Sequence, residues 1–124
     1  MPNFKNARHS EDIHRELTDI LRSLKDPRID PMLSVVRTEL SRDGSVCKVY
    51  VSSLSGLETA RESVKGLKSA AGYIRREIGS RLAMRHTPEF QFIADDSIEY
   101  GVHISRLLRE IAPEEDGAKG ESEQ

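Results

Sequence analysis

The sequence has little of what many small proteins use for stability or catalysis. Its 124 residues include a single cysteine, Cys47, no tryptophan, three tyrosines and three phenylalanines. One cysteine excludes an intramolecular disulfide and fits a reducing compartment, and within an expected strand it indicates a small buried apolar side chain. There is no run of about eighteen apolar residues and no signal-peptide pattern. We therefore expect a soluble, cytoplasmic protein with no membrane partner.

Catalytic and metal-binding motifs are also missing. The four histidines show no i, i+4 pair and Cys47 has no partner thiol, so zinc spacing is absent. The sequence contains neither a Gly-x-Ser-x-Gly elbow nor a Gly-x-x-x-x-Gly-Lys phosphate loop. Asp95, Asp96 and Glu99 could hold Mg²⁺ in a metal-dependent ribonuclease, but capping of a helix explains these acids more simply. We expect no enzyme activity, no cofactor and no bound metal.

The net charge of −2 gives no overall attraction to nucleic acid. Its distribution is uneven, because residues 113–124 hold five acids and one lysine, and the first 112 residues are left with a charge of about +2. We expect residues 113–124 to form a disordered acidic tail, because they lack apolar residues to bury. Binding to RNA would therefore depend on local clusters of basic residues.

The clearest cluster lies in residues 57–85. Apolar residues recur there at helical intervals of three or four, at Ala60, Val64, Leu67, Ala71, Ile74, Ile78 and Leu82. A second face of the same helical pattern is basic and is formed by Arg61, Lys65, Lys68, Arg75 and Arg76. Gly72 lies among these cations. The pattern predicts a helix that buries one face and presents a basic stripe with bare backbone at its centre.

Two interpretations of Gly72 remain open, because glycine costs a helix interior about 1 kcal/mol relative to alanine. In the first, Gly72 marks a helix end or a packing kink, and the cations are an ordinary solvated face. In the second, Ala70-Ala71-Gly72 is an elbow between two helices, where a sugar-phosphate backbone approaches the amides at the second helix's N-terminus.

The remaining chain predicts an α+β domain of two layers. Residues 1–9 are expected to be a polar arm, and Ser10 to cap a helix that reaches about Lys25. Strands are expected at 33–41 and 46–54 around a turn at Gly44, and a third at 89–94 after the helical pair. A last helix, with an apolar face, is expected to end at Pro113. The order is α-β-β-α-kink-α-β-α, with a three-stranded sheet packed against helices.

This order, with a glycine-marked turn between the central helices, resembles the type II KH RNA-binding domain. Ordinary KH domains have Gly-x-x-Gly at that turn, whereas this chain has Ala70-Ala71-Gly72, which is similar to the Ala-x-Gly kink of the ribosome-binding factor A family. Other segments agree with that family over about residues 5–112: Lys25-Asp26-Pro27-Arg28, Leu40-Ser41-Arg42-Asp43, Cys47–Val51, Ala70–Arg75 and Thr87-Pro88-Glu89-Phe90.

The resemblance implies a monomeric assembly factor that binds the immature 30S subunit and its 16S rRNA. It implies help with late maturation and 5′-end processing, a role in cold adaptation, and release by an assembly GTPase. The candidate RNA-binding residues are Arg61, Lys65, Lys68, Ala70, Ala71, Gly72, Tyr73, Arg75 and Arg76, together with Lys5, Arg8, Arg28 and Arg85. On this interpretation residues 10–112 form the KH-like domain. The alternative is a protein-interaction module recruited to ribosomes through its C-terminal helix and acidic tail.

Overall fold

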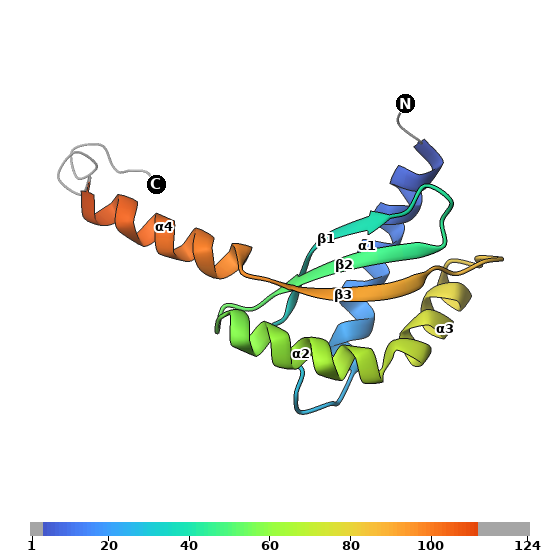
Figure 1. Ribbon diagram of the computed structural model, residues 1–124, viewed down its shortest axis with the longest axis horizontal. Coiled ribbons are helices and arrows are strands. Elements are labelled where there is room, and N and C mark those ends of the chain that lie inside the picture. The colour runs from blue at the N-terminus through green and yellow to red at the C-terminus, as the bar shows by residue number, and fades with distance from the viewer. Residues whose placement is uncertain (1–3, 112–124) are drawn as a thin grey trace.

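The computed structural model describes residues 4–111, with side chains from Arg8 onward. Four helices and three strands follow one another in the expected order (Figure 1). They are α1 (Phe4–Ser23), β1 (Ser34–Leu40), β2 (Val46–Ser52), α2 (Leu57–Ser69), α3 (Ala71–Arg81), β3 (Glu89–Asp95) and α4 (Ser97–Ile111). None of the described helices has the length and apolarity needed to cross a bilayer.

The sheet has the strand order β1-β2-β3. β1 and β2 form an antiparallel hairpin, with a bulge between Val35 and Arg37, and β3 pairs parallel to β2 with Cys47 opposite Phe90. A parallel neighbour requires a long crossover, which the α2–α3 unit supplies. The α+β fold class and the three-stranded sheet are thus confirmed.

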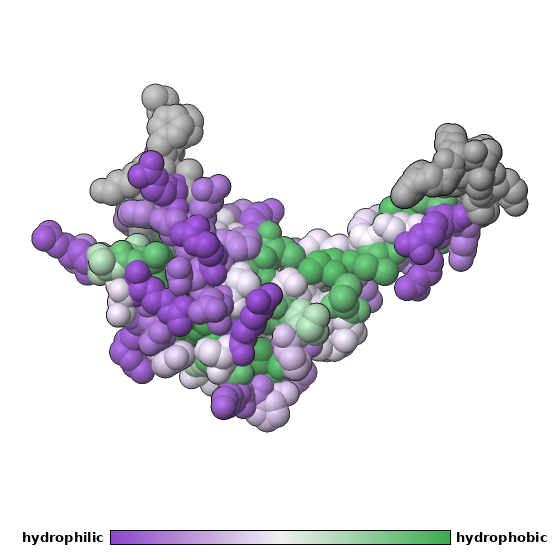
Figure 2. All heavy atoms as spheres, turned by 180° about the vertical axis from the view of Figure 1, so that it is seen from behind, coloured by the Kyte–Doolittle hydropathy of each residue, from purple (hydrophilic) through white to green (hydrophobic). Residues whose placement is uncertain are grey.

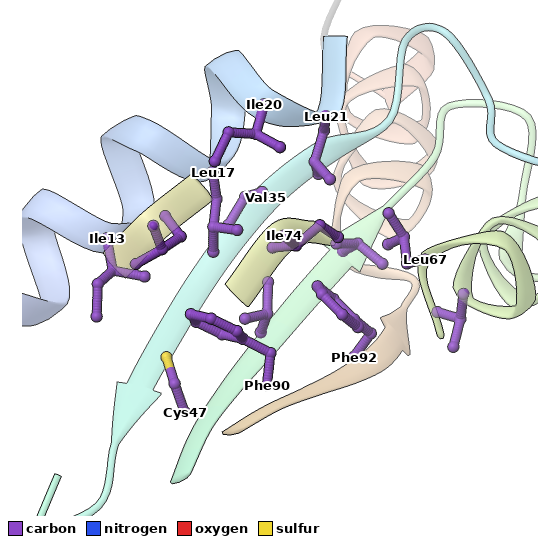
Figure 3. Close-up of a cluster of buried hydrophobic side chains, with 14 of the residues drawn as sticks. Ile13, Leu17, Ile20, Leu21, Val35, Cys47, Leu67, Ile74, Phe90 and Phe92 are labelled. Atoms are coloured by element: carbon purple, nitrogen blue, oxygen red, sulfur yellow. The ribbon is translucent and has the colours of Figure 1, made fainter. Parts of the chain in front are cut away.

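One face of the sheet carries the core (Figure 3). Alternate residues of β2 and β3 point into it, because side chains alternate along a strand. Residues of α1 and of the α2–α3 unit meet them, so three helices cover this face. The buried set includes Ile13, Leu17, Ile20, Cys47, Val49, Val51, Leu67, Ile74, Ile78, Phe90 and Phe92. Burial raises the pKa of the Cys47 thiol to about 12, because a thiolate would lose its hydration there.

The first helix begins earlier than the sequence predicted. α1 starts at Phe4, so the expected start at Ser10 is wrong, and residues 4–9 belong to the helix rather than to an arm. The Ser10 hydroxyl bonds Thr38 of β1 instead of capping the helix, with 2.8 Å between the two hydroxyl oxygens. The prediction failed because a serine hydroxyl can either cap a helix or bond a neighbouring strand. The tertiary contact with β1 decides between these two roles.

The last helix departs from the rest of the domain. α4 leaves the end of β3 and extends away from the other elements (Figure 1). Its amphipathic pattern predicted packing, yet none of its residues is buried. Its start is held to the body by the Ile98 amide, which donates to the Ser52 hydroxyl at 3.3 Å.

Candidate nucleic-acid interface

The break between α2 and α3 falls at Ala70, two residues before the glycine that the sequence singles out. Ala70 has φ −95° and ψ 9° and belongs to neither helix. Its amide bonds the carbonyls of Gly66 and Leu67, both at 3.1 Å, which closes α2. Its carbonyl accepts from the Ile74 amide at 2.9 Å, which opens α3. One residue therefore produces the elbow, while no side chain caps the N-terminus of α3.

Gly72 lies on the exposed face of α3, in its first turn. Its φ is not positive, so the backbone does not require glycine. A Cβ built there would meet only the guanidinium of Arg76, at an ordinary contact distance of 3.8 Å. The packing-kink interpretation of Gly72 therefore has no support in the contacts. The residue leaves bare backbone on an open surface.

Two cations of the stripe on α2 are paired with acids of the same helix. Arg61 lies 2.7 Å from Glu58, and Lys65 lies 2.8 Å from Glu62. All four side chains are more than half exposed. Exposed pairs of this kind contribute no more than about 1 kcal/mol, so a phosphate can replace the acid at little cost.

Lys68 and Arg76 differ from these pairs. Both are exposed, on either side of the Ala70 break, and neither makes a hydrogen bond or ion pair within the described part of the chain. Tyr73, next to Gly72, is 41% exposed. These groups surround the elbow without having to give up an internal contact to reach a ligand.

Two arginines of the predicted site are engaged in holding loops. The Arg75 guanidinium donates to the carbonyl of Thr87 from Nε at 3.2 Å and from Nη2 at 2.9 Å, which joins α3 to the segment before β3. Arg28 bonds Asp26 and also reaches the Ser69 hydroxyl at 3.0 Å, beside the elbow. This arginine holds the pKa of Asp26 at about 2.

Of the remaining predicted site residues, three lie away from the elbow and one, Ala71, lies directly after its break. Arg85 is exposed in the loop between α3 and β3, and Arg8 is exposed near the start of α1. Lys5 lies in the first turns of α1, and its side chain is outside the described part. Ala71 is the first residue of α3 and is half-buried. The structure therefore gathers most of the predicted residues along α2 and α3 and places Arg8 and Arg85 elsewhere.

The acids considered for a metal site have structural roles. Asp95 accepts from the Ser97 amide at 2.6 Å, which lowers the pKa of its carboxyl and begins α4. Among the residues that the structure describes, no three histidine, cysteine or acidic side chains gather as metal ligands do.

A three-stranded sheet, an elbow between two crossover helices and a cationic surface around it define a KH-like α+β domain of the type II order. Residues 5–108 match the family model described as ribosome-binding factor A. A protein of that name from Caldanaerobacter subterraneus subsp. tengcongensis is 48% identical over 113 residues, covering 90% of this chain and 93% of the relative. This chain belongs to the ribosome-binding factor A family.

Solved structures agree with this membership. A solution structure from Thermotoga maritima, assigned to the same family by its description, is 34% identical, has a TM-score of 0.68, and the match covers 80% of this chain and 94% of that one. A homology model of Thermus thermophilus ribosome-binding factor A, fitted into a map of a complex with the 30S subunit, is 29% identical with a TM-score of 0.54. That match covers 72% of this chain and 89% of the other.

Proposed function

We propose that this protein is a non-catalytic assembly factor that binds the immature 30S subunit and its 16S rRNA through the α2–α3 elbow. The observation that carries the proposal is Gly72, an exposed glycine that neither backbone conformation nor internal packing requires. A helical glycine that neither the backbone conformation nor the packing requires is suited to the close approach of a ligand backbone. The relative from Thermus thermophilus described in a 30S complex supports the choice of partner.

The elbow would act through phosphate contacts and shape. Lys68 and Arg76 supply charge without a partner among the described residues, and they lie beside the N-terminus of α3, which no side chain caps and whose dipole favours an anion. Arg61 and Lys65 would exchange their exposed acids for phosphates. Since the stretch lacks a Gly-x-x-Gly clamp, a folded rRNA surface is a better ligand than a specific single-stranded sequence.

The finer steps of the proposal are help with late subunit maturation and 5′-end processing of 16S rRNA, a role in cold adaptation, and action as a cytoplasmic monomer with release by a GTPase. These steps rest on family membership. Processing itself would belong to another protein, since the proposed role of this chain is to hold the rRNA in a conformation that allows it.

The test replaces the two unpaired cations, in the variant Lys68→Glu/Arg76→Glu. Filter binding to purified 30S subunits over a range of salt concentrations should show much weaker binding and a salt slope lower by about two units. The control variant Arg106→Glu/Arg109→Glu makes the same change of charge on exposed positions of α4 and should bind like the wild type. Equal binding by the elbow variant and the control would contradict the proposal.

A second candidate function rests on α4. Tyr100, Leu107, Leu108 and Ile111 are between 40 and 77% exposed and share one stripe with Ile104, at spacings typical of a helix that docks in an apolar groove. Figure 2 shows apolar side chains along this helix where it stands clear of the body. On this reading a protein partner on the ribosome, such as a ribosomal protein or the GTPase, receives α4.

A further inference from the structure

A hollow of about 460 Å³ lies at the end of α3 away from the elbow. Three segments line it: the start of α1 with His9, the turn between β1 and β2 with Arg42 and Asp43, and the loop after α3 with Arg85 and His86. These residues are far apart in the sequence, so no local pattern connects them. Leu40, Leu82 and Met84 provide apolar lining that continues into the core.

Among the described residues that line the hollow, two arginines, Arg42 and Arg85, outnumber one acid, Asp43. The one acid that lines it, Asp43, directs the same carboxylate oxygen to the Ser41 hydroxyl at 2.8 Å, the Ser45 hydroxyl at 2.8 Å and the Ser45 amide at 3.1 Å. These bonds lower the pKa of its carboxyl and bind it to its own turn. Arg85, by contrast, is exposed and makes no hydrogen bond or ion pair with any described residue.

The loop that carries Arg85 is held in one shape. Ala83 has φ +50°, a conformation that alanine adopts at a cost of about 1 kcal/mol, and it ends α3 with the Met84 amide 3.0 Å from the Gly79 carbonyl. Arg75 holds the carbonyl of Thr87 further along. The Glu89 amide bonds the Ser45 carbonyl at 2.9 Å, which ties the loop to the hairpin turn. Because the loop backbone is fixed at both ends, mainly the Arg85 side chain has to be ordered on binding.

The geometry points to a second phosphate subsite for RNA in this hollow, with Arg85 as its principal contact and His9 and His86 beside it. The inference rests on the proposed function and extends it, since it places a contact beyond the elbow. The 11 residues of α3 separate the two places by about 16 Å at 1.5 Å per residue.

The test compares Arg85→Ala with Arg106→Ala, a matched loss of an exposed arginine on α4. Binding to 30S subunits should weaken a few fold for Arg85→Ala, with a salt slope lower by about one unit, and should be unchanged for Arg106→Ala. Circular dichroism should show both variants folded, because neither arginine has an internal partner among the described residues. Titration with inorganic phosphate should shift the amide NMR signals of residues 83–86 in the wild type and not in Arg85→Ala.

The elbow variant Lys68→Glu/Arg76→Glu separates this inference from the function on which it depends. Wild-type binding and salt slope for Arg85→Ala, together with weak binding by the elbow variant, would overturn the subsite and leave the proposed function intact. Wild-type behaviour of both variants would overturn both.

Discussion

Gly66, Gly72 and Gly79 of the α2–α3 unit have different neighbours, and these neighbours indicate the role of each glycine. A Cβ on Gly66 would lie 2.7 Å from Cγ1 of Ile29, and one on Gly79 would lie 2.6 Å from the Thr87 hydroxyl. Both are closer than van der Waals contact allows, so these two glycines permit helices and loops to pack. Gly72 has no such neighbour. Composition counts these residues alike, and only their contacts distinguish a packing glycine from an exposed one.

Alanine substitutions at Gly66 and Gly72 should therefore have opposite effects on stability. Gly66→Ala is expected to lower the free energy of unfolding by about 1–3 kcal/mol, since Ile29 is buried and has little room to move. Gly72→Ala should raise it by up to about 1 kcal/mol, because alanine favours the helix. Urea denaturation measures both. A large loss of stability in Gly72→Ala would restore the packing role that we reject.

At the scale of elements, Arg81 joins α3 to α1, two helices that are far apart in the sequence. Its guanidinium lies 2.7 Å from Asp19 and 3.2 Å from Glu16, both on α1, and 3.2 Å from Glu77 on its own helix α3. These acids raise the pKa of the arginine. The helical periodicity of the sequence predicts only that Arg81 lies near the end of a helix. It cannot predict the contacts with α1, because the two acids there are more than sixty residues away.

Removal of this cation should loosen the contact between α1 and α3. Arg81→Ala is expected to lower the free energy of unfolding measurably, and added salt should reduce the difference from wild type, since exposed ion pairs are screened. Arg15→Ala, which removes a single exposed pair with Asp12, serves as the control and should cost less. A loss for Arg81→Ala that is independent of salt would show that packing of its side chain, not charge, matters.

At the scale of the whole molecule, the protein divides into a packed body and a projecting helix. The body buries one core between the sheet and α1, α2 and α3 (Figure 3), and α4 contributes no buried residue to it. The side-chain hydrogen bonds that join the start of α4 to β2 and β3 in the described part of the chain are made by the amides of Ser97 and Ile98. The stability of the body should therefore not depend on the outer turns of α4.

A chain that ends at Gly101 should test this division. It keeps the first contacts of α4 and loses most of the exposed apolar stripe, so its thermal midpoint should stay within a few degrees of wild type. Binding to 30S subunits should persist if the elbow is the main contact, and should fail if α4 is. A chain that ends at Ala112 retains α4 and isolates the contribution of residues 113–124. A large fall in the midpoint of the shorter chain would mean that α4 packs on the body in solution.

The sequence by itself determined the order of the elements, the core-facing residues of the helices and strands before α4, and the position of the basic stripe, because each follows from local periodicity and turn chemistry. Family membership was also readable there, from the Ala70-Ala71-Gly72 stretch and the motifs around it. Only the tertiary structure decided that Ser10 bonds β1 instead of starting α1, that Arg75 and Arg28 hold loops, and that α4 stands apart. The hollow around Arg85 likewise exists only after folding. Each of these outcomes depends on which distant segments meet, and pairing between distant segments leaves no periodic signal in the chain.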